Sequence, residues 1–137
     1  MLLFASALVA QEGQATDLDR MQGTWVVVSL TERGKAVPAE EASAIEIVID
    51  KDTYTAFEKG KVVVKYKVKL DPTRKPKEID FTYLVGDDKD KTEAAIYKFD
   101  KEQLTFCLDE DKKGRPKVFE GKETETFSIL VLKKKPK

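Results

Sequence analysis

The chain has 137 residues with 25 basic and 25 acidic side chains, no histidine and a single cysteine. This length fits one domain with a core of its own. A formal charge of zero provides no global field to draw the protein to nucleic acid or anionic lipid, so we expect neither partner. Without histidine, a Ser/His/Asp triad, a Cys/His pair and a His/Cys zinc site are excluded, and Cys107 alone cannot form an intrachain disulfide.

The first sixteen residues are predicted to be a signal peptide followed by a polar spacer. An apolar run, residues 2–10, is too short to span a bilayer, which needs about 20 residues. Ala5, Ala7 and Ala10 are small residues suited to cleavage, although a basic region before the run is lacking. We expect a secreted or periplasmic product without an integral membrane segment, with residues 17–137 forming one domain. The alternative is that this apolar segment is only a frayed N-terminal end and not a cleaved signal.

The polar lead-in, Thr16 to Gln22, predicts one helical turn capped by Thr16 or Asp17. The first strong β run, Thr24 to Arg33, follows and contains the only tryptophan, Trp25. Pro38 to Ala44 then predicts a short helix, because proline suits the first helical position and acidic residues follow in the first turn.

From residue 45 onward, short alternating segments predict one strand after another. Ile45, Ile47 and Ile49 alternate with outward positions, and residues 53–57 follow an Asp-Lys-Asp turn. After a Lys-Gly turn, residues 61–70 alternate most cleanly, with Val62, Val64, Tyr66, Val68 and Leu70 on one face and mostly lysines on the other. One face of this strand is expected to be core and the other solvated.

The second half of the chain repeats this pattern. Further strands are predicted around Ile79 to Tyr83, Ala94 to Phe99, Leu104 to Leu108, Lys117 to Glu120 and Thr126 to Lys133. Hairpin-length connections favour a meander over a Greek-key sandwich, and meanders close readily into barrels. The sequence therefore predicts an all-β, antiparallel up-and-down barrel of about eight to nine strands, with one short helix after the first strand.

The inward positions of such a barrel are aromatic and aliphatic. Buried tyrosine hydroxyls need partners and can offer themselves to a polar group of a ligand. The candidate ligand-binding residues are Tyr54, Tyr66, Val68, Phe81, Tyr83, Tyr97 and Phe106. An equally weighted alternative is that these side chains fill the barrel completely.

Gly23-Thr24-Trp25, at the head of the meander, resembles the Gly-x-Trp signature of lipocalins and related calycin barrels. Residues 21–30, 34–38 and 70–80, with Gly114-Arg115-Pro116, resemble the small lipocalin-like domain family of uncharacterised, exported planctomycete proteins, so that the resemblance spans about residues 18–133. It implies a fold and an exported location, and it supplies no catalytic residue. It also implies that Gly23 and Trp25 are structural, with Lys133 or Lys134 packing on the indole.

Two acidic loops partly match metal-binding patterns. Asp109, Asp111, Gly114 and Glu120 match positions of a calcium-binding loop, but Lys113 replaces an oxygen ligand and the flanks are predicted strands. Lysines also interrupt Asp87, Asp88 and Asp90. We expect no metal and no cofactor.

The carboxylates fall in turns and on solvated faces, so the chain is not expected to be an enzyme. Cys107 is expected to be a structural thiol whose pKa is raised by nearby acids. The leading hypothesis is an exported lipocalin-like binding module for a small apolar or amphipathic ligand. The alternatives are a ligand-free barrel that acts as an interaction or inhibitory module of the cell envelope, and a weak hydrolase on the acidic loops.

Overall fold

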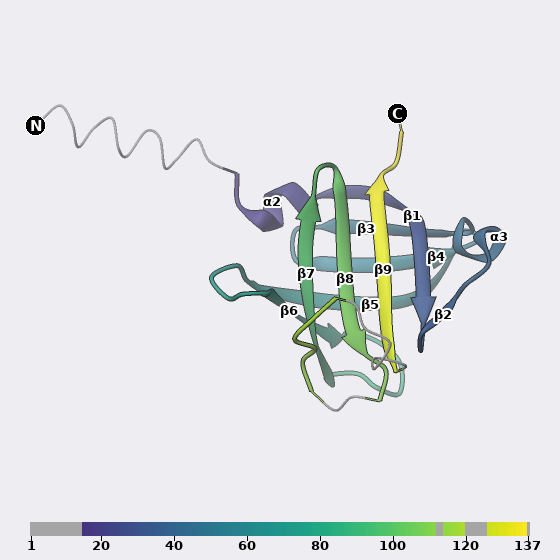
Figure 1. Ribbon diagram of the computed structural model, residues 1–137. Coiled ribbons are helices and arrows are strands. Elements are labelled where there is room, and N and C mark those ends of the chain that lie inside the picture. Colours follow the sequence, from purple (N-terminus) through teal and green to yellow (C-terminus); the bar gives the residue numbers. More distant parts are fainter. Residues whose placement is uncertain (1–14, 112–113, 120–125, 137) are drawn as a thin grey trace, which may run out of the picture.

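The structure, a computed structural model, describes residues 15–111, 114–119 and 126–136 (Figure 1). Within these ranges one antiparallel sheet runs in the order β2-β1-β3-β4-β5-β6-β7-β8-β9, and pairing of β1 with β9 closes eight strands into a barrel. The short β2 is an extra strand beside β1. The strands are β1 (Gly23–Glu32), β2 (Lys35–Ala36), β3 (Ile45–Asp50), β4 (Thr53–Glu58), β5 (Lys61–Asp71), β6 (Lys77–Tyr83), β7 (Thr92–Asp100), β8 (Gln103–Asp109) and β9 (Phe127–Lys134). The predicted fold class is confirmed.

A short helix before the barrel, α2 (Asp17–Met21), lies at the end of the barrel that also carries the β7–β8 turn (Figure 1). Thr16 caps it in a capping box with Asp19, each backbone N–H donating to the other side chain at 3.1 Å. These bonds satisfy donors that a helix start otherwise leaves unpaired. The cap therefore fixes α2 where Met21, which is completely buried, enters the core.

The predicted helix after the first strand is confirmed as α3 (Ala39–Ala42). Pro38 stands one position earlier than expected, at the N-cap. Proline is tolerated there because the first turn of a helix leaves its N–H groups without intrahelical partners.

The alternation of the strands determines which side chains form the core. Ile47 and Ile49 on β3 are almost fully buried, and their neighbours along the strand face outward or are less buried. On β5 the pattern fails at its start, where Val62 and Val63 are both more than half exposed. The pairing of β4 with β5 shifts register there, so Val62 does not reach the core as the sequence predicts.

The predicted strand at Lys117 to Glu120 is wrong. Residues 117–119 are not in a strand, and Glu120 lies outside the described residues. Residues 114–119, here called the strap, instead cover part of the outer wall of the barrel. Pro116 is buried, and the Val118 carbonyl oxygen accepts a hydrogen bond from Cys107 Sγ at 3.6 Å.

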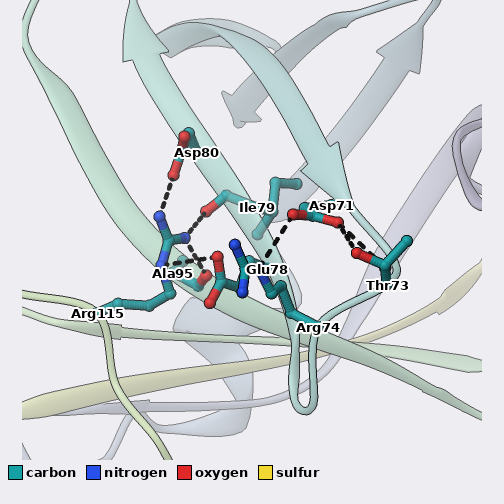
Figure 2. Close-up of polar contacts among 8 residues, drawn as sticks. All are labelled: Asp71, Thr73, Arg74, Glu78, Ile79, Asp80, Ala95 and Arg115. Atoms are coloured by element: carbon teal, nitrogen blue, oxygen red, sulfur yellow. Dashed lines mark hydrogen bonds and ion pairs between the residues drawn. The ribbon is translucent and has the colours of Figure 1, made fainter.

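Arg115 fastens the strap to the outer wall (Figure 2). Its guanidinium donates to the carbonyl oxygens of Ile79 and Ala95 at 3.2 and 2.9 Å, and to Asp80 Oδ1 at 2.7 Å. The Glu78 carboxylate lies 3.5 Å from its Nε. One side chain thus ties the strap to both β6 and β7.

Cys107 lies beneath this strap, fully buried, with its cross-strand partner Ile96 also buried. Neither residue belongs to the main core, so the strap creates a second, smaller buried layer. Burial, with a smaller contribution from Asp109, raises the pKa of Cys107 to about 12. The pKa of Cys107 is raised as expected, but its main cause is burial and not the nearby acids that the sequence indicated.

Candidate functional site

The end of the barrel near α2 is closed. Trp25 is 2% exposed, and its indole Nε1 donates to the Met21 carbonyl oxygen at 2.7 Å. The structure places Lys134, not Lys133, against the ring, with Nζ 4.8 Å from the ring centroid and a hydrogen bond to the Gln22 carbonyl oxygen. This arrangement leaves the indole no free face for a ligand.

A partly buried polar contact lies at the same end. The Tyr97 hydroxyl donates to Asp17 Oδ2 at 2.7 Å, and Lys77 Nζ lies 2.9 Å from the same oxygen. Burial raises the pKa of Tyr97, and the neighbouring carboxylate raises it further. Burial by itself would raise the pKa of Asp17. The hydrogen bonds from Tyr97 and Lys77 have the larger combined effect, so the pKa is lowered. Tyr97 is therefore occupied inside the fold.

Aromatic rings fill the middle of the barrel. The ring centroid of Tyr54 lies 5.5 Å from that of Tyr66, 5.3 Å from Phe81 and 5.9 Å from Phe106, all in edge-to-face arrangements. Such distances are the optimum for aromatic packing. Below them Val68 is buried as well, so these side chains occupy the space in which larger barrels hold ligands.

Above these rings, at the other end, lies a cup of about 160 Å³. Its volume is below the range of roughly 300–1,000 Å³ typical of drug-sized ligands. It is close to that of an engineered apolar cavity of about 150 Å³ that takes up benzene. The cup therefore suits a ligand about the size of one ring. It is lined by Leu30, Glu32, Tyr54, Val64, Tyr66, Phe81, Phe106, Leu108, Glu110, Ser128 and Leu130.

The hydroxyl of Tyr54 makes no hydrogen bond to a residue that the structure describes. The residue as a whole is 6% exposed, but no enclosed side-chain oxygen or nitrogen in the described part of the chain lacks a partner, so this hydroxyl opens into the cup. Burial alone raises its pKa, so it is a neutral hydroxyl at physiological pH. Buried tyrosine hydroxyls usually find a partner, so a polar atom of a ligand is a natural one.

Two carboxylates line the rim of the cup. Glu110 accepts a hydrogen bond at 2.5 Å from the hydroxyl of Ser128, which is 8% exposed. Glu32, at the end of β1, is exposed. The guanidinium of the neighbouring Arg33 pairs with Asp111 at 2.8 Å.

A chain of hydroxyls runs beside the cup. Tyr66 and Tyr83 are hydrogen-bonded to each other, and Tyr83 donates to Glu93 Oε1. Burial and the bond to Glu93 raise the pKa of Tyr83 to about 12, while the bond from Tyr66 acts in the opposite direction. Tyr66 is thus held in place by its own partner, which leaves Tyr54 as the cup hydroxyl available to a ligand.

The seven residues predicted to bind a ligand are not brought together. Tyr54, Tyr66, Phe81 and Phe106 line the cup. Val68 lies deeper in the core, Tyr83 is engaged by Glu93, and Tyr97 is at the closed end. The sequence also missed Glu32, Glu110 and Ser128. Their place in the cup depends on strand register, such as the pairing of Leu108 with Ser128, which alternation alone does not give.

The acidic loops use their carboxylates within the fold. Asp109 Oδ1 accepts from the Asp111 N–H at 3.0 Å and from the Thr126 hydroxyl at 2.8 Å. Lys113 and Glu120 of the calcium-like pattern lie outside the described residues. In the second loop Asp88 pairs with Lys91 at 3.1 Å. Among the residues that can be placed, no three or more aspartates, glutamates or cysteines gather as a metal site would require.

A larger hollow of about 530 Å³ lies at the closed end, but side chains of the protein already cover its rings. Arg20 stands 3.9 Å from the ring centroid of Phe99, and Lys134 covers Trp25. The cup offers buried apolar surface with an unpaired hydroxyl, so it is the better candidate site. Within the described part of the chain, no helix is long and apolar enough to cross a membrane.

Comparison with known proteins identifies the fold alone. No protein-family model matches the chain, and no curated protein matches it. A solved structure of a lipocalin-like protein from Bacteroides uniformis ATCC 8492 superimposes with a TM-score of 0.50, covering 84% of this chain and 98% of the other. The two sequences are 10% identical. The chain therefore has a lipocalin-like fold.

Proposed function

We propose that this protein is a binding module that holds a small, ring-sized ligand in the cup at the open end of its barrel. The observation that carries the proposal is the hydroxyl of Tyr54, which opens into a cup walled by aromatic rings and makes no hydrogen bond to a described residue. Burial against Tyr66, Phe81 and Phe106 would supply affinity, and the hydroxyl would orient a polar atom of the ligand.

The lipocalin-like fold supports a binding role, because barrels of eight strands have room for one small ligand. The volume of the cup limits the small apolar or amphipathic ligand that the sequence suggested to about the size of one ring. We also propose that the protein is exported, on the strength of its apolar start, and that it is related to the exported planctomycete family that it resembles. A binding role without catalysis is part of the same proposal.

The filled interior favours a second candidate. Tyr54, Phe81 and Phe106 occupy the middle of the barrel. In this second candidate the barrel binds no ligand, and its outer surface acts on another protein of the cell envelope. This candidate predicts that the cup stays empty toward every small molecule.

The test is titration of the full chain with phenol and toluene, followed through the backbone amide resonances of residues that line the cup. Val64→Phe adds volume inside the cup, whereas Val28→Phe adds the same volume at a position on β1 that is 44% exposed. We expect saturable shifts in the wild type and in Val28→Phe, and at least about a tenfold weaker response in Val64→Phe. Equal binding by both variants, or no saturable shift at millimolar probe, would overturn the proposal.

A further inference from the structure

We propose that the cup selects organic cations, namely small amines or quaternary ammonium compounds with an apolar body about the size of one ring. This inference rests on the proposed binding role of the cup. The volume of the cup and its aromatic wall indicate the size and apolar character of the ligand, and the present inference adds its charge.

The first observation is that the charged residues of the lining, among those that the structure describes, are both acidic. They are Glu32 and Glu110, and the described part of the lining contains no lysine or arginine. Glu32 is the last residue of β1, and Glu110 directly follows β8. Because β1 and β8 both pair with β9, the two carboxylates lie on either side of β9. An ammonium group at the rim would therefore meet carboxylates from two walls.

The cations nearest to Glu32 along the chain are Arg33 and Lys35. Arg33 pairs with Asp111 at 2.8 Å, whereas Lys35 is the cross-strand neighbour of Glu32. Neither Glu32 nor Glu110 has an ion-pair partner among the residues that the structure describes. Ser128 holds Oε1 of Glu110 at 2.5 Å, which fixes the carboxylate in place. The Glu110 carboxylate is thus held in position, and no described residue neutralises either carboxylate by an ion pair.

The wall and floor of the cup suit a cation as well. Tyrosine and phenylalanine rings attract a cation that lies near their faces, and Tyr54, Tyr66, Phe81 and Phe106 supply four such rings. The free hydroxyl oxygen of Tyr54 can accept from an ammonium N–H. Rings and carboxylates favour a positive group, and a carboxylate ligand would meet two like charges. The hydroxyl does not discriminate, because it can accept from an ammonium group or donate to an anion.

The opposite end of the barrel shows the contrast. The hollow there is lined by Arg20, Lys101, Lys133 and Lys134, with a single acidic residue, Glu102. The formal charge of zero is therefore unevenly distributed between the two hollows, basic at the closed end and acidic at the cup. An anionic probe would be drawn away from the cup.

The experiment compares three probes of similar shape at pH 7 and low salt: benzylammonium, benzyl alcohol and benzoate. Binding to the full-length chain is measured by calorimetry, and its location by the amide resonances of the cup. We expect benzylammonium to bind at least about fivefold more tightly than benzyl alcohol, and benzoate to bind most weakly. Added salt should reduce the preference for benzylammonium, because rim charges are screened.

Glu32→Gln and Glu110→Gln should each reduce the preference, and the double variant should abolish it. The amide oxygen of the introduced glutamine can still accept from Ser128, so the fold is retained. Glu102→Gln removes the same charge at the other end and should leave the preference unchanged.

The outcomes separate the two proposals. Equal binding of benzylammonium and benzyl alcohol would refute cation selection while leaving the binding role intact. Binding of none of the three would refute both. A preference that survives in the double variant would show that the carboxylates are not its source and would overturn the inference.

Discussion

Lys134 holds its ammonium nitrogen 4.8 Å from the ring centroid of Trp25, and the same nitrogen lies 3.1 Å from the position that a Cβ would occupy on Gly23. It also donates to the carbonyl oxygen of Gln22. The glycine and the tryptophan of the Gly-x-Trp pattern thus meet at one lysine. Gly23 leaves room for the amine, and the amine covers the indole that closes the barrel.

Substitution of Gly23 should therefore be more destabilising than its backbone angle alone explains. Gly23 and Gly114 have nearly the same φ, +117° and +113°, but nothing lies within 4 Å of a Cβ added at Gly114. Both alanine variants should lose about 1–3 kcal/mol through backbone strain. Gly23→Ala should lose about 1 kcal/mol more, because Lys134 must move off the indole. Urea unfolding followed by Trp25 fluorescence measures both, and equal losses would contradict the shared role of the lysine.

The sequence predicted the walls of this barrel better than its ends. Alternation such as Ile45, Ile47 and Ile49 identifies the inward face of a strand, and the structure confirms it. Alternation does not give height along the barrel axis. Tyr97 was therefore predicted to contact a ligand with Tyr54, although it lies at the closed end against Asp17.

The long-range contacts of the loops and of the cup rim could not be predicted from the sequence either. Ser128 meets Glu110 only because β8 and β9 pair in one particular register. Arg115 reaches Asp80, 35 positions away, from a segment that was predicted to begin a strand. Neither contact leaves a periodic signal in the sequence, because each depends on how the closed sheet brings distant residues together.

The partly buried carboxylate of Asp17 should make stability depend on pH in the acidic range. Its folded-state pKa lies below the ordinary value of about 3.9, so its contribution is fully present above about pH 4 and is lost as the pH falls through the folded-state value. Asp17→Asn should cost about 1.5 kcal/mol at pH 7, since Lys77 loses its ion pair and Tyr97 a charged acceptor. It should also flatten the fall in stability below pH 4.

The measurement is the free energy of unfolding at pH 7, 5, 4 and 3. Asp52→Asn is the matched control, because that carboxylate is exposed and lies 3.9 Å from Lys67. The control should cost less than about 0.5 kcal/mol at pH 7. If Asp17→Asn keeps the full wild-type loss of stability between pH 4 and 3, another group is responsible for it.

Release of the strap should expose the thiol beneath it. Arg115 makes three hydrogen bonds to β6 and β7, and Cys107 lies under Val118 with a pKa raised to about 12. Arg115→Met should raise the rate of thiol modification at pH 8 by about tenfold, because loss of roughly 1.4 kcal/mol of charged hydrogen bonding favours local opening. Arg74→Met is the control, because Arg74 pairs with Asp71 in solvent (Figure 2). Equal rates in the two variants would mean that Arg115 does not hold the strap.

Two tyrosines beside the cup should respond in opposite ways to loss of a hydroxyl. Tyr54 has no hydrogen-bond partner among the described residues, whereas Tyr83 donates to Glu93 and is bonded to Tyr66. Tyr54→Phe should change the free energy of unfolding by less than about 0.5 kcal/mol, and Tyr83→Phe should lower it by about 1.5 kcal/mol. Binding should show the reverse order: Tyr54→Phe should weaken phenol binding by about fivefold and leave toluene binding unchanged, because only phenol can pair with the hydroxyl. A large stability loss in Tyr54→Phe would show that its hydroxyl already has a partner inside the fold.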